Sequence, residues 1–136
     1  MKNYSLFILT FFVLTLVTTI AAALDESAVK EYFSGWNNGD VNKIMSYFAK
    51  DIVYEDVPKG ETATGRSEVK AFVQKFVSEN PDVKLVLDST TIGTAGAAAE
   101  WTMSGGVGDQ AWSVRGASIM VHTEGKFSRV TDYWDK

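Results

Sequence analysis

The sequence predicts one α+β domain in which helices pack on one face of a curved, largely antiparallel (mixed) sheet. Apolar residues recur at helical spacing in the first half of the chain, and runs rich in β-branched and aromatic residues follow one another in the second half. Helices first and consecutive strands afterwards favour a sheet covered on one side. Glycines near and within these runs allow the sheet to curl and to enclose a cavity.

Residues 1–23 have the pattern of a secretory signal peptide. Lys2 is the only charge before Asp25, and the apolar block between them closes on three small residues ending at Ala23. We therefore expect cleavage after Ala23, a domain of residues 24–136 and a secreted or periplasmic protein. The alternative is an N-terminal membrane anchor, because about 18 apolar residues lie at the lower edge of what spans a bilayer. After cleavage, no stable membrane association is expected.

Composition limits the class of partner. The formal net charge is −4, and removing the positive Lys2 with the leader gives −5. No basic stripe is present, so nucleic acid is not an expected partner. Because the chain has no cysteine, burial alone must hold the domain together, and about 113 residues suffice for one core.

Three helices are predicted in the first half of the domain. The first begins at Asp25 and ends at Asn37-Asn38-Gly39, the second is capped by Asp40, and the third is capped by Ser67 and ends before Asn80-Pro81. Their apolar stripes are, in order, Val29, Tyr32, Phe33 and Trp36; Val41, Ile44, Met45 and Phe48; and Val69, Phe72, Val73, Phe76 and Val77.

Five strands are predicted, one before the third helix and four after it. They run from Ile52 to Val57, Val83 to Thr91, Ala97 to Ser104, Ala111 to His122 and Lys126 to Trp134.

Several short motifs accompany this order of elements. They are Trp36-Asn37-Asn38-Gly39-Asp40, Tyr54-Glu55-Asp56-Val57-Pro58, Gly65-Arg66, Arg115-Gly116, Gly125-Lys126 and Asp132-Tyr133-Trp134-Asp135. Together they resemble the nuclear transport factor 2-like (cystatin-like) superfamily, and within it the SnoaL-like polyketide cyclase and ketosteroid isomerase branch. The resemblance covers essentially the whole mature chain and implies a cone-shaped sheet wrapped around N-terminal helices. One such fold hosts many functions, so it specifies the fold far better than the reaction.

The resemblance to the isomerases implies positions for site residues. Their hydrogen-bond-donating tyrosine falls on Tyr32 and their general base on Asp56. Their protonated aspartate falls on Ser118 or Ala117, which is a departure that removes a strong donor. A small apolar residue of their pocket falls on Asp132, so this pocket gains a carboxylate.

The residues themselves support acid–base chemistry. Alternation places Ile52, Tyr54 and Asp56 on one side of their strand. In apolar company the proton affinity of Asp56 rises toward that of a general base, and the phenol of Tyr32 can stabilise an enolate. Two plainer interpretations stay open: Asp56 satisfies turn amides before Pro58, and Tyr32 is a core aromatic.

Asp132 is the second candidate carboxylate. It is in phase with Trp134 on the last strand, so both are expected to face the cavity. Asp56 and Asp132 would then divide acid and base roles. An ion pair of Asp132 with Arg115 or Arg129 is the alternative.

The remaining pocket residues come from three sources. Strand alternation gives most of them, helical spacing puts Trp36 on the same face as Tyr32, and the resemblance implies Ser118. On its strand, Trp101 is expected to point inward with Met103, and Glu100 outward. The predicted pocket lining is Trp36, Tyr54, Trp101, Met103, Ser118 and Trp134, which suits a small, flat, hydrophobic ligand.

Other chemistries lack the residues they need. With one histidine, His122, expected at the surface, and no cysteine, neither a metal site nor a nucleophilic triad is predicted. No cofactor is expected either, because a glycine-rich strand-to-helix turn for a dinucleotide is missing.

Two functions follow. The first is a cofactor-free isomerase, cyclase or dehydratase-like enzyme that acts on a small hydrophobic carbonyl compound, with Asp56 as base, Tyr32 as donor and Asp132 as second acid. The second is a non-catalytic module that binds a hydrophobic ligand or pairs with itself. The resemblance implies a homodimer in either case.

Overall fold

The computed structural model describes residues 24–135, so the predicted leader lies outside the described residues. The helices are α1 (Glu26–Asn37), α2 (Val41–Ser46) and α3 (Gly65–Glu79). The strands are β1 (Phe48–Asp56), β2 (Glu61–Thr64), β3 (Lys84–Ile92), β4 (Gly96–Gly105), β5 (Trp112–Thr123) and β6 (Lys126–Trp134), with a 3₁₀ turn, η1 (Gly108–Gln110), between β4 and β5. Within the described range, no helix is long and apolar enough to cross a membrane.

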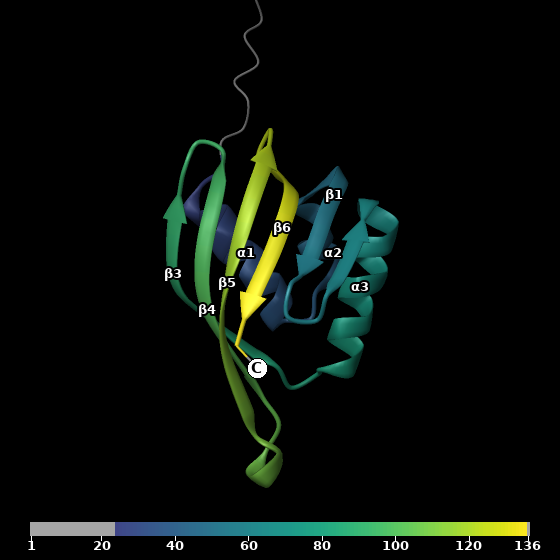
Figure 1. Ribbon diagram of the computed structural model, residues 1–136, viewed down its shortest axis with the longest axis vertical. Coiled ribbons are helices and arrows are strands. Elements are labelled where there is room, and N and C mark those ends of the chain that lie inside the picture. Colours follow the sequence, from purple (N-terminus) through teal and green to yellow (C-terminus); the bar gives the residue numbers. More distant parts are fainter. Residues whose placement is uncertain (1–23, 136) are drawn as a thin grey trace, which may run out of the picture.

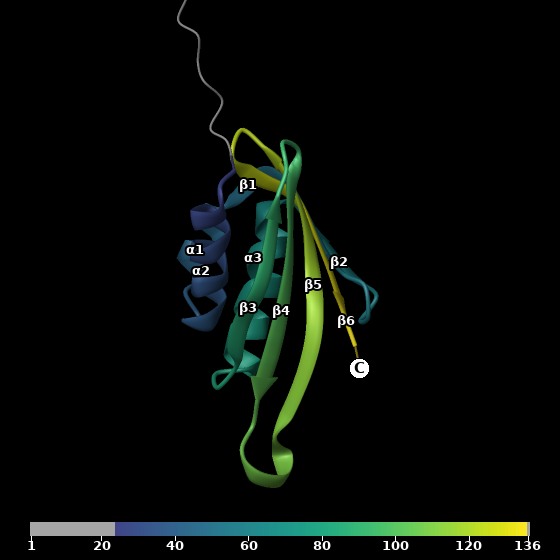
Figure 2. The ribbon, with the colours of Figure 1, turned by 90° about the vertical axis from the view of Figure 1, so that its left-hand side faces the viewer.

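The strands form one mixed sheet in the order β2-β1-β6-β5-β4-β3 (Figure 1). Neighbouring strands are antiparallel except β1 and β6, which are parallel. The helices lie on one side of the sheet, which curves around them (Figure 2). The predicted α+β class with a curved mixed sheet is confirmed.

Irregular pairing accompanies this curvature. The register shifts between Leu87 and Ser89 on β3 and between Val121 and His122 on β5. An extra residue in one strand bends it and increases its twist. The β4–β5 hairpin continues beyond the end of the other strands (Figure 1). The sheet therefore wraps around the helices instead of lying flat against them.

Two of the three predicted helix starts are confirmed. The Asp25 carboxylate accepts the Ala28 N–H at 2.8 Å, and the Asp40 carboxylate accepts the Lys43 N–H at 2.9 Å. The prediction that Ser67 caps the third helix is wrong, because α3 begins earlier, at Gly65.

The boundary between α2 and β1 and the number of strands also differ from the prediction. Phe48 was expected on the second helix, but α2 ends at Ser46 and Phe48 is the first residue of β1. The short strand β2 was not predicted at all. Three of its four residues are exposed, so it shows no apolar alternation.

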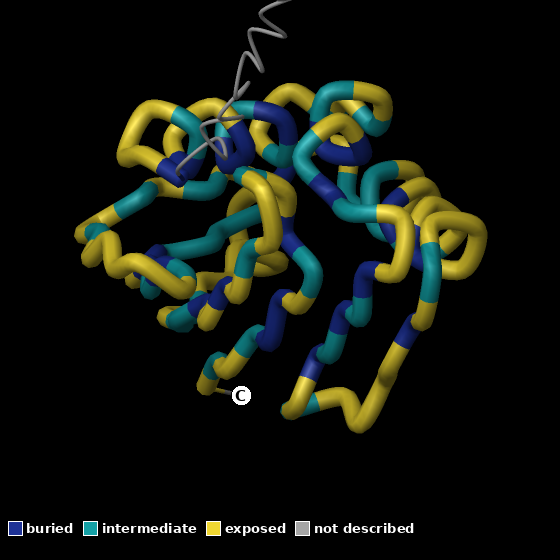
Figure 3. The backbone as a smooth tube through the Cα atoms, turned by 90° about the horizontal axis from the view of Figure 1, so that it is seen from above, coloured by how far each residue is buried: buried dark blue, intermediate teal, exposed yellow. Residues whose placement is uncertain are grey.

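The core lies between the helices and the concave face of the sheet, with buried segments on both layers (Figure 3). Tyr32 of α1 stands at its centre. Its ring makes edge-on contacts with the rings of Phe33, Trp36, Tyr47, Phe48 and Phe127, at centroid distances of 5.1 to 6.2 Å. Such contacts add to the stability from burial and fix α1 against β1 and β6.

Candidate functional site

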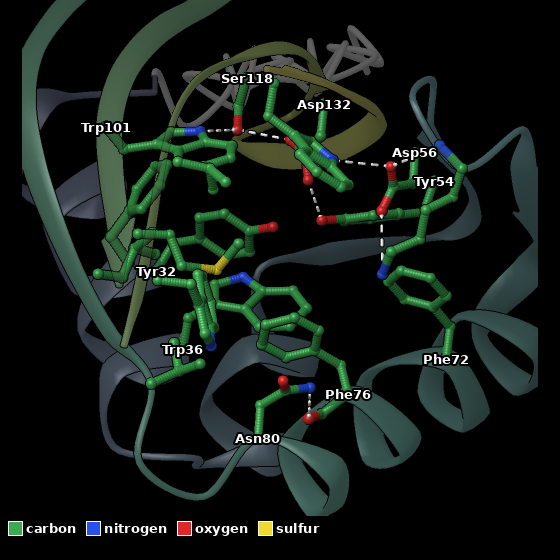
Figure 4. A pocket seen from close by; sticks show the side chains of 18 residues that line it. Tyr32, Trp36, Tyr54, Asp56, Phe72, Phe76, Asn80, Trp101, Ser118 and Asp132 are labelled. Atoms are coloured by element: carbon green, nitrogen blue, oxygen red, sulfur yellow. Dashed lines mark hydrogen bonds and ion pairs between the residues drawn. The ribbon is translucent and has the colours of Figure 1, made fainter. Parts of the chain in front are cut away.

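A cavity of about 260 Å³ opens between the concave face of the sheet and helices α1 and α3 (Figure 4). All nine predicted site residues line it: Tyr32, Trp36, Tyr54, Asp56, Trp101, Met103, Ser118, Asp132 and Trp134. The alternation on β1, β4 and β6 therefore predicts the correct face of each of these strands. Ser118 lines the cavity, and Ala117, its alternative in the isomerase comparison, does not.

Sequence reasoning missed part of the lining. Phe72 and Phe76 come from the inner face of α3, Trp112 from β5, and Lys59 and Asn80 from connections. The two phenylalanines belong to a predicted apolar stripe, so the pattern contained a signal for them. Lys59 follows Asp56 in the β1–β2 turn, and nothing in the local sequence distinguishes it from a solvated lysine.

Asp132 lies in a hydrogen-bonded network of neutral donors. Ser118 Oγ donates to Asp132 Oδ1 at 2.6 Å, and the Tyr54 hydroxyl donates to Asp132 Oδ2. Ser118 in turn accepts the indole N–H of Trp101 at 2.9 Å. Residues of β1, β4, β5 and β6 thus fix one carboxyl group (Figure 4).

The surroundings of Asp132 change its acidity. Burial raises the pKa of Asp132 from 3.8 to about 6, the hydroxyls of Ser118 and Tyr54 oppose this rise, and the charge of Asp56 adds to it. A carboxyl group with this pKa exchanges protons readily near neutral pH.

Two tyrosines supply hydroxyl groups to the same region. Burial raises the pKa of both Tyr32 and Tyr54 well above 10.0, and the charge of Asp132 contributes to both shifts. Both phenols are therefore protonated at neutral pH. Figure 4 shows the Tyr32 hydroxyl directed into the pocket, toward the Asp132–Tyr54 pair.

Asp56 is buried, on the same side of β1 as Ile52 and Tyr54. Its Oδ1 accepts the indole N–H of Trp134 at 2.9 Å, and Lys59 Nζ lies 3.5 Å from its Oδ2. The Lys59 backbone N–H also donates to Oδ1 at 3.4 Å. Asp56 therefore accepts a turn amide, as the plainer interpretation expects, and also faces the pocket.

The alternative ion pair of Asp132 is wrong. Arg129 on the opposite face of β6 pairs with Glu55, and Arg115 instead donates its backbone N–H to Asp135. Glu100 also points outward, where it accepts a hydrogen bond from Ser89 at 2.6 Å, while Trp101 is buried.

The arrangement combines an apolar cavity, two carboxyl groups of different surroundings and protonated phenols. It is chemically suited to bind a hydrophobic molecule and to move a proton on it. Among residues 24–135, no three acidic or histidine side chains gather in a way that would hold a metal ion.

Comparison with solved structures gives the fold. A protein with a ketosteroid isomerase-like fold from Catenulispora acidiphila, crystallised with trimethylamine, aligns with a TM-score of 0.73 at 18% identity, over 79% of this chain and 85% of its own. A candidate polyketide cyclase from Xanthomonas campestris aligns at 0.67 and 20% identity, over 80% and 88%. TerC, crystallised with polyporic acid, aligns at 0.69 and 16%, over 80% and 89%.

At these identities the likeness establishes the architecture and leaves the reaction open. No sequence among the curated proteins matches the chain. The sequence profile of the SnoaL-like domain, in contrast, matches residues 29–130, which span the described core from α1 to β6. The chain belongs to the SnoaL-like domain family.

Proposed function

We propose that this protein is an exported enzyme that moves a proton on a small hydrophobic carbonyl compound by carboxylate acid–base chemistry. The observation that carries the proposal is the state of Asp132. Its carboxyl group lies in an aromatic cavity, receives hydrogen bonds from two hydroxyls, and has a pKa of about 6.

Asp132 takes the role of base in this proposal, although sequence reasoning gave that role to Asp56. Asp56 has a cationic neighbour in Lys59, whereas the donors to Asp132 are neutral. A carboxylate without a cation in an apolar site has the higher proton affinity, which favours removal of a proton from carbon. Asp56 then acts as the second charge of the pair and raises the pKa of Asp132.

The proposed step is proton abstraction next to a carbonyl group. Asp132 takes the proton from carbon, and the carbonyl oxygen gains negative charge as the enolate forms. The Tyr32 hydroxyl donates a hydrogen bond to that oxygen, and this bond strengthens as the charge develops. Return of the proton to the same carbon gives exchange, and return to another carbon gives isomerisation.

Deuterium exchange tests this proposal. The protein is first incubated with a mixed library of aromatic and cyclic ketones, and the retained compounds are identified by mass spectrometry. Those compounds are then incubated with the protein in D₂O, and deuterium gain next to the carbonyl is measured. We expect Asp132→Asn to slow exchange about 10²- to 10⁴-fold, and Asp56→Asn to slow it less.

The matched control is Asp51→Asn on β1, the same substitution at an exposed position. This variant is expected to exchange at the wild-type rate. Exchange by Asp132→Asn at the wild-type rate would contradict the proposal.

A binding module without turnover is the second candidate. Ser118 stands where the isomerase resemblance implies an acid, and both Asp132 oxygens already accept internal hydrogen bonds. The complexes of related folds with trimethylamine and polyporic acid also support ligand binding as such. In this case, library compounds are retained by wild type and by Asp132→Asn, and neither protein exchanges deuterium.

We also propose that two copies associate through the outer face of the sheet. Ile119, Val121 and Tyr133 are 46%, 41% and 49% exposed on the neighbouring strands β5 and β6. An exposed apolar strip of this kind is typical of an association surface. Sedimentation should give a dimer for wild type and a monomer for Ile119→Lys. A monomeric wild type would refute the proposed association.

Export is proposed from the sequence of residues 1–23. The described domain begins directly afterwards, since Leu24 packs in the core and Asp25 caps α1. Mass spectrometry of the protein secreted by a bacterial host is expected to give a chain that starts within a residue or two of Leu24. Recovery of the full-length chain in the membrane fraction would favour an anchor instead.

A further inference from the structure

Lys59 occupies a small site built from three different elements. Its Nζ lies 3.5 Å from Asp56 Oδ2 of β1, 5.9 Å from the centre of the Phe76 ring of α3 and 6.0 Å from the Trp134 ring of β6. A carboxylate together with two aromatic faces is the arrangement that recognises ammonium groups in proteins. We call Asp56, Phe76 and Trp134 the ammonium cage.

The side chains of the ammonium cage are held by the sheet and by α3, whereas Lys59 belongs to an exposed turn. Trp134 donates its indole N–H to Asp56 at 2.9 Å, and the Asp56 side chain is only 9% exposed. The Lys59 side chain is 41% exposed and reaches the cage from the turn between β1 and β2. A lysine has a flexible four-carbon stem, so its ammonium group can leave without movement of the sheet.

We propose that the ammonium cage is a binding subsite for the amino group of a hydrophobic amine, and that Lys59 fills it until the ligand amine takes its place. The apolar body of such a ligand would lie against the neighbouring aromatic wall of the cavity, which includes Trp36 and Phe72. This assignment concerns binding and does not depend on proton transfer by Asp132.

The geometry favours a cation over an anion. A carboxylate bound to Lys59 would lie close to Asp56, which carries the same charge. It would also face the negative π surfaces of Phe76 and Trp134. An ammonium group meets attraction from all three, and it replaces the countercharge that the buried Asp56 loses when Lys59 moves away.

Three probes with one hydrophobic body test the proposal: 4-phenylbutylammonium, 4-phenylbutan-1-ol and 4-phenylbutanoate. Binding is measured by tryptophan fluorescence and by calorimetry at about pH 8, where all three keep their charge states. Lys59→Met removes the ammonium group while keeping an unbranched side chain that is one atom shorter. We expect this variant to bind the ammonium probe about five- to tenfold more tightly than wild type does, with little change for the alcohol.

Two further variants isolate the cage. Asp56→Asn combined with Lys59→Met should abolish the preference for the ammonium probe over the alcohol. Lys70→Met, which removes an exposed charge on α3, should bind all three probes as wild type does. Lys59→Gln repeats the test with a polar replacement, and circular dichroism confirms that each variant is folded.

Three results would overturn the assignment. One is an ammonium-to-alcohol ratio that Lys59→Met and Lys59→Gln leave unchanged. The second is a preference that survives removal of Asp56. The third is tight binding of the carboxylate by wild type that Lys59→Met abolishes, which would make Lys59 an anion site. Failure of these tests leaves deuterium exchange by Asp132 unaffected, so the two proposals fail separately.

Discussion

Asp56 and Asp132 are register partners on the parallel strands β1 and β6. Partners on adjacent strands send their side chains to the same face of the sheet, so both carboxyl groups enter one cavity. Their surroundings then separate them. Asp56 has Lys59 and the Trp134 indole, and Asp132 has the hydroxyls of Ser118 and Tyr54. Two acids in one cavity therefore have different hydrogen-bond and ionic partners.

The free energy of unfolding should depend on pH through Asp132. Its pKa is about 6 in the folded protein against 3.8 as the ordinary value, so between these values the folded protein binds more protons than the unfolded chain. The stabilising contribution is full below about pH 4 and is lost as pH rises through about 6. We expect a loss on the order of 1–2 kcal/mol, because Asp132 is half-buried and water moderates the effect.

Urea unfolding of wild type and Asp132→Asn between about pH 4 and pH 8 measures this loss. Because asparagine does not titrate, the stability difference between the two proteins isolates position 132. As the pH rises, wild type should lose unfolding free energy relative to Asp132→Asn. A constant difference across the range would show that Asp132 titrates as an ordinary exposed aspartate.

Removing the Tyr54 hydroxyl should raise the pKa of Asp132 further. The hydrogen bond from Tyr54 favours the charged form and opposes the effect of burial. For Tyr54→Phe we expect an increase of about half a unit to one unit, since one hydrogen bond is worth about 1 kcal/mol. Carbon-13 NMR of the Asp132 carboxyl group follows the titration directly, and the midpoint of deuterium exchange should rise by the same amount.

Tyr47→Phe is the matched control for this experiment. Tyr47 packs against the rings of Tyr32 and Phe127 and donates no hydrogen bond to Asp132. Removal of the Tyr47 hydroxyl should leave the pKa of Asp132 unchanged. Equal shifts in both variants would mean that loosened packing, and not the lost hydrogen bond, controls the acidity.

Alternation along single strands predicted the inward-facing side chains of β1, β4 and β6, because it depends only on neighbours in sequence. Asp56, Trp101 and Trp134 all point where the pattern places them. The pairing of β1 with β6 was beyond this reasoning, since no local signal says which strands are adjacent. The proximity of Asp56 to Asp132 therefore had to be inferred from a resemblance, and the structure supplies their register.

The failures also have local causes. Phe48 continues the helical spacing of Ile44, yet the chain leaves the helix before it, and spacing alone cannot locate that exit. At the start of α3, no Ser side chain acts as the cap. The Glu68 carboxylate instead accepts the Thr64 N–H at 2.8 Å. The role of Lys59 is purely tertiary, because Phe76 and Trp134 come from distant elements.

Asn37 joins the end of α1 to the edge strand β3. Its Oδ1 accepts the Leu85 N–H at 2.8 Å, and its Nδ2 donates to the Leu85 carbonyl at 2.5 Å. Asn37→Asp removes the donor and directs a carboxylate at that carbonyl, so we expect a loss of about 1–2 kcal/mol in unfolding free energy and faster amide exchange at Leu85. Asn38→Asp places the same charge beside it and should cost less than about 0.5 kcal/mol. Equal losses would assign the effect to the helix terminus instead.

Gly116 leaves the space in which the Trp101 indole lies. A Cβ at position 116 would stand 2.3 Å from the Trp101 ring and 2.7 Å from the Tyr133 carbonyl oxygen, so one of them has to move. The indole is the more mobile of the two, and its displacement breaks the hydrogen bond to Ser118 that helps to orient Asp132. We expect Gly116→Ala to lower the free energy of unfolding by about 1–3 kcal/mol and to slow deuterium exchange.

Gly93→Ala is the control, since its Cβ would meet nothing closer than 3.6 Å. Urea unfolding and the near-ultraviolet circular dichroism of tryptophan separate the two variants. If Gly116→Ala behaves as Gly93→Ala does in both measurements, the added methyl group does not displace the Trp101 indole, and the close approach of Trp101 to Gly116 does not limit which residue can stand at position 116.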